Sequence, residues 1–455
     1  MYRSVTIPFF LMLGLLLSPG TMRSQDFVSV DAKTYNLYLE SKWDELIRAG
    51  KEGLKKDIDY YYLRMRIGIA CYEQKDYKAS QAHFRKALEF NTGDPVALEY
   101  LYFAYLLAGQ QQQARLLARH FTPSLEEKIH PAAVKFADML SVEYLYNFSD
   151  AEHILSEPER YFSGLPYGIQ LITRRFNNLN LMLQHAPAAG FTLTHAYTRL
   201  SKSNYYYYDD GLSRYGVDNQ QVVQHQYYIS PAFTTCGGLT IAPAFHYLRI
   251  RSEIPYMVSS GSGPGFGGGT GSYVGYANLM ASHFVGGLNL TQYAGRFAVR
   301  LGGIFSYMNE ARQATGSGGL TWYPLGNLGL YMNASLNAHL EFTGGSTSLE
   351  LIPDFLFGFG ISSRVWMEFS GAFGDMRNYT EGNGYIVYNG LDWMRYKIMT
   401  SIVIPFTPKG SRIYLGSRFS ENESRFIPSD PAGTGDINEI ITNNISIYGG
   451  LSWIF

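Results

Sequence analysis

The order of apolar and polar residues changes its period along the chain. Between about residues 25 and 157, apolar residues recur every three or four positions, which predicts amphipathic helices. From about residue 190 to the last residue they alternate with polar residues, which predicts β-strands whose two faces meet different surroundings. The segment 330–342 shows this clearly, because its even positions are apolar and its odd positions are Tyr, Asn, Ser, His and Glu. We therefore expect an α+β chain with an N-terminal helical domain and a C-terminal domain of strands.

The length of the predicted strands indicates a membrane. Segments such as 296–307 and 349–361 alternate over more than ten residues. Strands of globular proteins usually have about 5 or 6 residues, whereas a tilted membrane-crossing strand needs about 9 to 11. Short turns also alternate with longer loops, as in outer-membrane barrels. We predict an antiparallel transmembrane β-barrel of about 12–14 strands over residues 190–455, with 158–189 as a connection or an extra strand pair.

Composition agrees with a membrane barrel. Of 455 residues, 16% are charged and 15% are aromatic, with 37 Tyr and 28 Phe. Soluble domains have about 25% charged residues, and tyrosine-rich strands suit the aromatic girdles at the membrane interfaces. The balance of 37 Lys+Arg and 38 Asp+Glu argues against nucleic acid as a partner. Cys71 and Cys236 lie too far apart in sequence for a disulfide framework or a clustered zinc site, so we expect neither metal nor cofactor.

Residues 1–24 predict a cleaved secretory signal. Arg3 precedes an apolar run from Ile7 to Leu17, and small polar residues follow it. The run is too short to span a bilayer, so an uncleaved anchor is the weaker alternative. We therefore expect export beyond the inner membrane.

The segment 67–91 resembles a tetratricopeptide repeat. Gly68 occupies the glycine position of the first helix, Ser80 replaces the usual small residue, and Phe84 and Ala87 occupy core positions of the second helix. The resemblance implies stacked helical hairpins over residues 25–157 with a groove for a periplasmic protein or peptide. The alternative is that the array's own last helix or the next domain fills the groove. The implied groove residues are Tyr62, Met65, Ile69, Tyr72, Val96, Glu99, Phe103 and Leu106.

The last strand carries an assembly signal. Leu451, Trp453 and Phe455 alternate at the end of the chain, which resembles the C-terminal signal that the β-barrel assembly machinery reads in bacterial outer-membrane proteins. The two-domain organisation resembles outer-membrane proteins with a tetratricopeptide domain and a barrel, such as the exopolysaccharide-secretion porins. Those porins usually have a longer array and a wider barrel. The resemblance implies a barrel among outer-membrane lipids and a helical domain in the periplasm.

Alternation also predicts which charged and polar residues face the barrel lumen. Their charges have both signs, so we expect ion pairs that fill a mostly closed barrel, with an open path for a small solute or polymer as the alternative. The predicted lumen residues are Arg296, Arg300, Asn333, His339, Glu341, Glu350, Asp354, Glu368 and Arg418.

The sequence predicts no catalytic site. The histidines at 195, 225, 246, 283 and 339 lie among strand tyrosines, without a serine and an acid at matching local spacing. The glycine-rich run 261–272 lacks the lysine of a phosphate-binding loop and is expected to be an external loop. We predict a non-enzymatic scaffold whose periplasmic arm recruits a protein partner. The first alternative is a transport or secretion pore for polysaccharide or small solutes, and the second is an outer-membrane hydrolase.

Overall fold

The computed structural model describes residues 20–131, 135–162, 167–209, 214–259, 272–362, 364–407, 410–428 and 439–455. Residues 1–19 of the predicted signal and residues 261–271 of the glycine-rich run therefore lie outside the described residues. The chain divides into two compact units, one of residues 1–110 and 117–130 and one of residues 111–116 and 131–455. None of the described helices combines the length and the apolar character that crossing a membrane would require.

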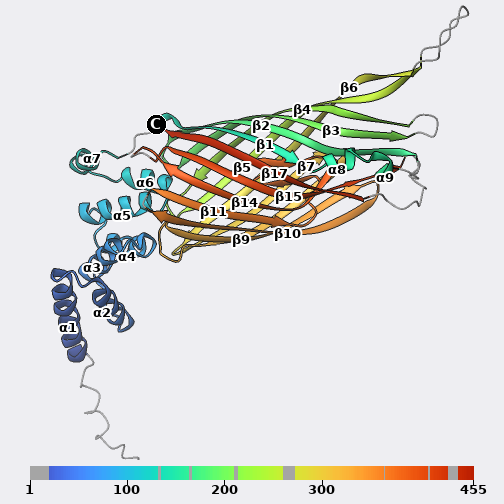
Figure 1. Cartoon of the computed structure of the whole chain (residues 1–455). Helices are drawn as coiled ribbons and strands as arrows, with labels where there is room; N and C mark the ends of the chain where they lie inside the picture. Colours follow the sequence, from blue (N-terminus) through green and yellow to red (C-terminus); the bar gives the residue numbers. More distant parts are fainter. Residues whose placement is uncertain are drawn as a thin grey trace, which may run out of the picture. The chain divides into compact units, whose positions relative to one another are not determined.

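The first unit consists of helices that follow one another along the chain (Figure 1). They are α1 (Gly20–Leu39), α2 (Trp43–Lys55), α3 (Tyr61–Glu73), α4 (Tyr77–Phe90), α5 (Pro95–Leu107) and α7 (Pro123–Ile129), while α6 (Gln111–Ala118) begins in the second unit. Helices α3 and α4 pack closely at Gly68, where a Cβ would lie 2.9 Å from the Phe84 ring. Ser80 Oγ also donates a 3.0 Å hydrogen bond to the Gly68 carbonyl. Asp76 and Asp94 cap α4 and α5 by accepting hydrogen bonds from backbone N–H groups.

The second unit is a closed antiparallel β-barrel (Figure 1). Its strands are β1 (Lys135–Ser149), β2 (Gly168–Ala188), β3 (Phe191–Asp209), β4 (Arg214–Thr234), β5 (Leu239–Ser259), β6 (Ser272–Ala294), β7 (Phe297–Met308), β8 (Ala311–Trp322), β9 (Leu330–Thr343), β10 (Ser346–Ser362), β11 (Val365–Phe373), β14 (Asp392–Pro405), β15 (Arg412–Arg425) and β17 (Glu439–Ile454). In the described part of the chain these fourteen strands pair with their neighbours in chain order. Val142 of β1 lies opposite Leu181 of β2 and also opposite Leu451 of β17, so the first and last strands close the sheet.

The two ends of the barrel differ in their connections. Short turns at 189–190, 235–238, 295–296 and 323–329 lie at the end that carries the C-terminus. The opposite end, which we call the loop end, carries α8 (Glu152–Leu155), α9 (Pro158–Phe162) and the short strand β16 (Ile427–Pro428). There the Phe162 ring stacks on Tyr207 with centroids 4.4 Å apart, within a buried apolar cluster. Two turns at the loop end, 309–310 and 344–345, are also short, but the longest connections, such as the one between β11 and β14, lie there, so we infer that the loop end is the outward end.

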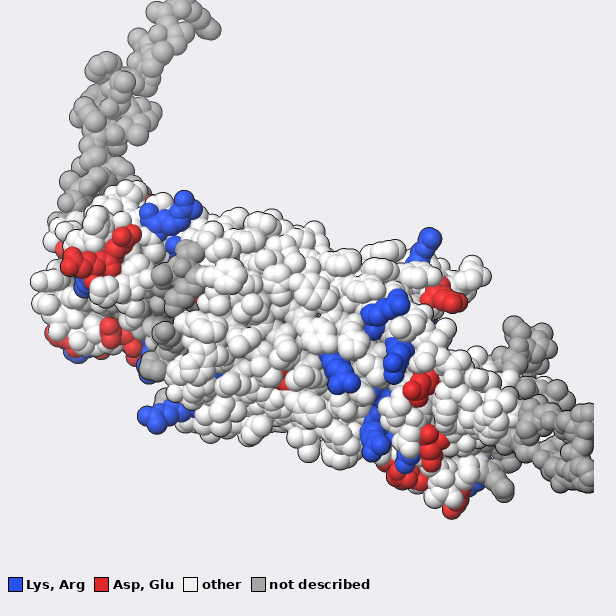
Figure 2. All heavy atoms as spheres, turned by 90° about the horizontal axis from the view of Figure 1, so that it is seen from above, with Lys and Arg blue, Asp and Glu red and all other residues white. Residues whose placement is uncertain are grey.

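The outer wall of the barrel carries an uncharged belt. On β7 the side chains of Val299, Leu301 and Phe305 are exposed, whereas Ala298 and Ser306 on the opposite face are buried. Figure 2 shows a broad band of the surface that is almost without charged side chains. An apolar band of this kind is what lipid requires of a barrel surface.

The helical part ends earlier than the sequence pattern predicted. Strand β1 falls inside the range 25–157, because its inward face mixes Leu145 with Ser141 and Asn147, so apolar residues also recur at helical spacing. The described part of the range 158–189 contains the short helix α9 and one continuous strand, β2, in place of a plain connection or a strand pair. The predicted order of helices followed by an antiparallel barrel is confirmed, and fourteen strands arise because β1 and β2 both join the wall. The tetratricopeptide character of the helices stays a prediction.

Candidate functional site

A hairpin that begins at the loop end folds into the barrel. It connects the neighbouring strands β11 and β14 and contains β12 (Tyr379–Glu381) and β13 (Ile386–Tyr388). Its turn contains Gly382, Asn383 and Gly384, with φ angles of 59°, 60° and 80°. Glycine and asparagine adopt this left-handed conformation at low cost, which explains the turn. We call residues 375–391 the lumen hairpin.

The tip of the lumen hairpin reaches strands far from its root. Tyr385 donates a 2.7 Å hydrogen bond to Asn180 Oδ1 on β2. His246 Nδ1 on β5 donates to the Gly384 carbonyl at 2.8 Å. Because β2 and β5 lie across the strand order from β11 and β14, the hairpin crosses the interior of the barrel.

The tip also binds the wall where strand pairing is interrupted. Pro231 of β4 and Pro243 of β5 fall opposite each other in the register, and the β4–β5 pairing is interrupted around them. Proline has no N–H and cannot donate to a ladder. Ser230 Oγ donates to the Pro243 carbonyl at 2.8 Å, and Asn383 Nδ2 donates to the neighbouring Ala242 carbonyl at 2.9 Å. Side chains thus take up backbone acceptors that a regular ladder would use.

One carboxylate fastens the start of the lumen hairpin. Glu341 of β9 is buried, and its Oε1 lies 3.2 Å from a guanidinium nitrogen of Arg377. The second oxygen, Oε2, accepts a 2.7 Å hydrogen bond from Asn378. Asn309, in the turn between β7 and β8, donates to Asn378 Oδ1 at 2.8 Å. The hairpin root is therefore tied to two different parts of the wall.

A buried ion pair fastens the middle of the lumen hairpin. Lys397 Nζ on β14 lies 2.5 Å from Glu381 Oε2 and donates a 2.8 Å hydrogen bond to the Tyr388 hydroxyl. The Lys397 and Glu381 side chains are 8% and 17% exposed. Beside them, the ring of Tyr379 is buried against Ile352 in an apolar cluster. An ion pair with this little exposure is costly to break on one side only.

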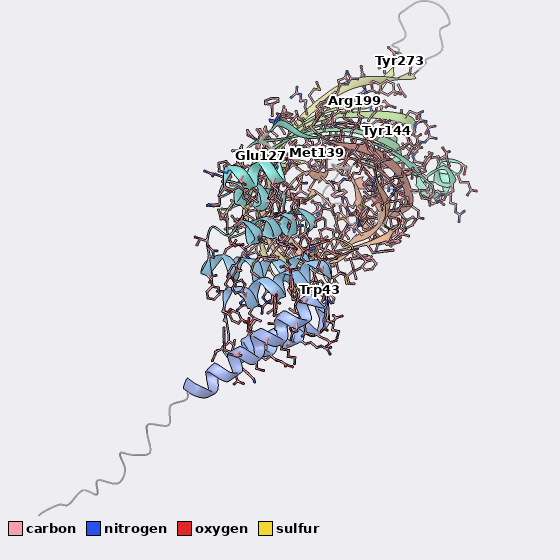
Figure 3. The ribbon with its side chains drawn as sticks, turned by 90° about the vertical axis from the view of Figure 1, so that its left-hand side faces the viewer. Trp43, Glu127, Met139, Tyr144, Arg199 and Tyr273 are labelled. Carbon is pink, nitrogen blue, oxygen red and sulfur yellow. The ribbon has the colours of Figure 1, made fainter. Side chains whose placement is uncertain are left out.

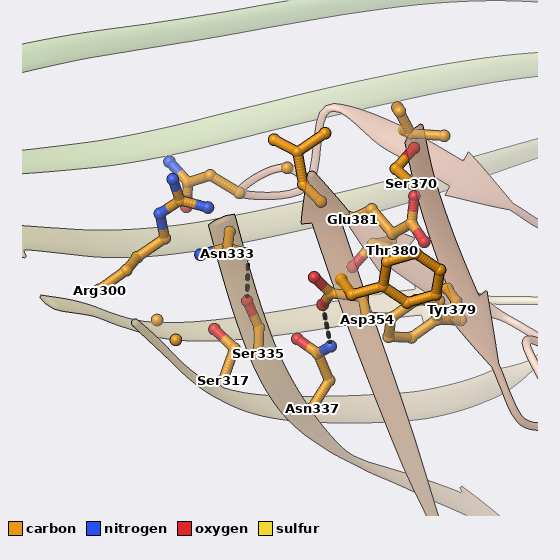
Figure 4. A pocket seen from close by; sticks show the side chains of 18 of the residues that line it. Arg300, Ser317, Asn333, Ser335, Asn337, Asp354, Ser370, Tyr379, Thr380 and Glu381 are labelled. Atoms are coloured by element: carbon orange, nitrogen blue, oxygen red, sulfur yellow. Dashed lines mark hydrogen bonds between the residues drawn. The ribbon is translucent and has the colours of Figure 1, made fainter. Parts of the chain in front are cut away.

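A cavity of 310 Å³ borders β12 and the wall formed by β6 to β11 (Figure 4). Its lining combines apolar side chains with polar groups that bind one another: Ser335 Oγ donates to Asn333 Oδ1 at 3.0 Å, and Asn337 Nδ2 donates to Asp354 Oδ2 at 2.8 Å. Arg300 adds one positive charge to the lining. The hairpin contributes Tyr379, Thr380, Glu381, Gly382, Asn383 and Ile386.

A second cavity of 140 Å³ borders β13 and the opposite part of the wall, from β15 and β17 through β1 to β4. Lys202 and Asp392 line it as an ion pair with a 2.5 Å separation. The lumen hairpin therefore divides the interior into two chambers.

One predicted lumen residue lies outside the lumen, and the others lie on the inner face of the barrel. Arg296 lies in the turn 295–296, where its guanidinium donates to the Pro324 carbonyl at 2.9 Å, because β7 starts one residue later than predicted. Arg300, Asn333 and Asp354 line the first cavity. The inward strand positions also hold His339, Glu341, Glu350, Glu368 and Arg418.

The residues that shape the site most were missed in the sequence. Glu381, Asn383 and Tyr385 were not among the predicted lumen residues, although the run Glu-Gly-Asn-Gly between apolar and aromatic residues is a hairpin signal. Lys397 also gave a signal, since an isolated lysine in an alternating strand of a lysine-poor region calls for a partner inside the barrel.

The eight groove residues implied by the tetratricopeptide resemblance differ in their solvent exposure. Tyr62 and Val96 are exposed, whereas Met65 is buried at 7% and cannot face a ligand. Glu99 forms an ion pair on the helix surface, and Tyr72 is half-buried against neighbouring rings. Ile69, Phe103 and Leu106 are also half-buried. The groove stays a prediction, without Met65.

The remaining candidates concern assembly and chemistry. Leu451, Trp453 and Phe455 lie at the end of the closing strand with 40%, 43% and 41% exposure, as lipid-facing residues would. His339 Nδ1 lies 2.8 Å from Thr315 Oγ1, and the other strand histidines also contact partners other than serine. Among the described residues, no cluster of His, Cys, Asp and Glu could hold a metal ion. The expectations of no enzyme and no cofactor stay predictions.

Comparison with known proteins gives matches to solved structures alone. No family model and no curated protein sequence matches the chain. A Pseudomonas aeruginosa FadL homologue has 9% identity and a TM-score of 0.42, with 74% of this chain and 94% of that chain covered. The Pseudomonas putida toluene transporter TodX has 8% identity and a TM-score of 0.39, with 70% and 89% covered. A bacterial polysaccharide outer-membrane secretin has 9% identity and a TM-score of 0.30, with 70% and 99% covered.

These findings correct the predicted function. The scaffold interpretation is wrong as the main one, because the barrel encloses two chambers beside the lumen hairpin. At these TM-scores the similarity says nothing about the substrate of this chain. The closed barrel with its uncharged outer belt is an outer-membrane protein, while the periplasmic position of the helices stays a prediction.

Proposed function

We propose that the barrel conducts a small polar solute across the outer membrane, with the lumen hairpin as an internal gate. The observation that carries the proposal is the 310 Å³ cavity, which is bordered by the hairpin and lined by side chains of the wall. A volume of this size lies within the range of ligand sites, about 300–1,000 Å³.

The polar groups in the lining are the reason for proposing a polar solute. Asn333, Ser335, Asn337 and Asp354 offer amide, hydroxyl and carboxylate groups within one cavity. These groups bind one another, but a hydrocarbon would still displace water from their remaining donor and acceptor positions, at a cost of about 1–3 kcal/mol for each one that is desolvated. A solute with several hydroxyl or amide groups would form the hydrogen bonds that the displaced water had formed. We therefore propose this class instead of the aromatic hydrocarbons named for the similar channels.

The lumen hairpin is suited to moving because it is not part of the wall. Strands β11 and β14 pair directly with each other from Trp366–Val403 to Phe373–Tyr396, so the ladder is complete without the hairpin. Displacing residues 375–391 breaks side-chain contacts to Glu341, Lys397 and the tip acceptors. It leaves the strand pairing of the barrel intact.

Uptake of sugars by liposomes tests the proposal. The full chain is compared with a variant in which a short Gly-Ser linker replaces residues 375–391, and liposome swelling is followed with sugars of increasing size. The linker variant should admit small sugars faster than the wild type. The matched control inserts the same linker at the exposed turn 344–345 and should behave like the wild type. A folded linker variant, identified by heat-modifiable gel migration, that admits none of the sugars would contradict the proposal.

A further inference from the structure

A row of basic side chains crosses the outer face of the barrel near the loop end. Arg199 of β3 lies opposite His225 of β4, and His225 lies opposite Arg249 of β5. Arg251 lies two positions further along β5, on the same face. All four side chains are exposed. We call these four residues the basic row; Figure 2 shows basic side chains gathered toward this end of the uncharged belt, and Figure 3 labels Arg199.

The basic row lies at the edge of the lipid-facing surface. The next row toward the C-terminal end consists of Tyr197, Tyr227 and Tyr247, which are opposite one another in the same register. Tyrosines concentrate where the hydrocarbon ends and the headgroups begin. Beyond them toward the C-terminal end lie Ile229 and Phe245, which continue the apolar surface, together with His195, whose Nδ1 lies 2.6 Å from the Tyr227 hydroxyl. The basic row therefore meets the headgroup layer of the outer leaflet.

The spacing of the row suits phosphate. Adjacent strands lie about 4.8 Å apart, so Arg199 and Arg249 are separated by about 10 Å, and Arg249 and Arg251 by about 7 Å along the strand. Guanidinium groups at these separations can converge on one or two phosphate groups, which they bind with paired hydrogen bonds. Tyr197 holds His225 through a 2.7 Å hydrogen bond, and Ser282 Oγ accepts one of 3.1 Å from Arg249.

The positive charges of the row are not balanced by the protein. Within the described part of the chain, no ion pair connects Arg199, Arg249 or Arg251 to a carboxylate. Glu253 lies two positions beyond Arg251 on the same face and offers one negative charge against three positive ones. Like charges in neighbouring positions repel, and a cation facing lipid is unfavourable unless an anion or water meets it. A bound anion would relieve both penalties.

We propose that the basic row binds the phosphate groups of anionic lipid headgroups in the outer leaflet. The charge of the row selects the phosphate, and the apolar surface beside the tyrosines accommodates the acyl chains. A free phosphate ion would use the first of these features but not the second. The site is independent of conduction through the lumen.

Lipid binding to the full chain in phosphatidylcholine nanodiscs tests the proposal. The nanodiscs are doped with phosphatidic acid as the probe, and the midpoint of the gain in barrel melting temperature gives its apparent affinity. Diacylglycerol, which lacks the phosphate, and inorganic phosphate serve as the two other ligands. The variant carries Arg199→Gln, Arg249→Gln and Arg251→Gln. The wild type should respond to phosphatidic acid at a concentration at least roughly tenfold below the one that the variant needs, and high salt should reduce this difference.

Two controls separate charge, fold and site. A variant with lysine at the same three positions keeps the charge and should retain most of the response. Loss of the response in the glutamine variant then results from the loss of charge and not from misfolding of the wall. The matched control removes three exposed arginines of the helical unit: Arg48→Gln with Arg85→Gln and Arg119→Gln. An equal loss of the response in this control, or an equal response of the wild type to diacylglycerol, would overturn the proposal. An equal response to inorganic phosphate would overturn the assignment to lipid.

Discussion

Replacement of Lys397 by methionine is expected to open the barrel. In the closed state Lys397 Nζ lies 2.5 Å from Glu381 Oε2 and also binds the Tyr388 hydroxyl. Methionine keeps a long flexible side chain and removes the charge. The Glu381 carboxylate then lies inside the barrel without its cation. It regains full solvation when the lumen hairpin leaves its place, so the substitution favours the displaced state.

The size of the effect follows from the burial of the pair. The Glu381 side chain is 17% exposed, so most of its hydration is lost in the closed state. Removing one partner of a buried ion pair costs about 3–5 kcal/mol. The partial exposure of Glu381 places it at the lower end, roughly 3 kcal/mol, which corresponds to about a hundredfold larger open population at ~1.4 kcal/mol per factor of ten. Adding Glu381→Gln to Lys397→Met removes both charges and should reverse most of the gain.

Single-channel recording in planar bilayers measures the open population directly, and a disulfide lock tests whether the hairpin is the gate. A Cβ at Gly384 would lie 4.0 Å from the Val285 Cβ, within the usual disulfide range of about 3.5–4.5 Å. Because a cysteine at the left-handed φ of 80° is strained, the reduced form of the same variant is the reference. Val285→Cys with Gly384→Cys, in a chain whose Cys71 and Cys236 are replaced by serine, should silence Lys397→Met under oxidation. Reductant should restore its conductance.

Two results would refute this reasoning. One is a folded Lys397→Met variant that is as silent as the wild type, because the ion pair would then contribute nothing to closure. The other is continued conductance of Lys397→Met with the disulfide formed, because the path would then bypass the lumen hairpin.

Other parts of the chain give three more expected outcomes. In the barrel without the hairpin, Arg300→Gln should lower the anion preference seen in reversal potentials, whereas Arg296→Gln in the turn should not, because fixed charges act where ions pass. Burial, followed by the charge of Arg64, lowers the pKa of His83 from 6.5 to about 4. Between these pH values the unfolded helices bind a proton that the folded ones do not, so acidification from pH 7 to pH 4 should lower their free energy of unfolding by roughly 3 kcal/mol. His83→Gln should make this loss of stability smaller in circular-dichroism melts of the full chain. Deletion of Phe455 should reduce the heat-modifiable fraction in outer membranes, and normal insertion of the shortened chain would contradict its role as a signal.

The barrel was predictable because its signal is local. The alternation in 330–342 fixes a strand and both of its faces without knowledge of any other segment. The same rule failed for β1, because Leu145 on the inward face makes the pattern compatible with a helix as well. In β2 the pair Asn177-Asn178 resembles a turn, whereas the structure continues the strand through it.

The lumen hairpin was not predictable in the same way, because its contacts are remote in sequence. Asn383 and Ala242 are 141 residues apart, and Tyr385 and Asn180 are 205 residues apart. Whether the turn at Gly382 points outward or into the barrel depends on these contacts, and no local pattern contains them. The predicted set of lumen charges could therefore contain Glu341 without revealing that it holds a hairpin.

The reach of these contacts also sets an order of assembly. The lumen hairpin can pair with itself early, since Tyr379 and Tyr388 are close in sequence. Its tip finds its acceptors on β2 and β5 in position after the wall has curved around it, and the wall closes when Asn147 of β1 meets Ser446 of β17, 299 residues away. Contacts over such separations form slowly. We therefore expect a newly closed ring to be still filled with water, so that closure of the wall and sealing of the lumen are two separate steps of assembly.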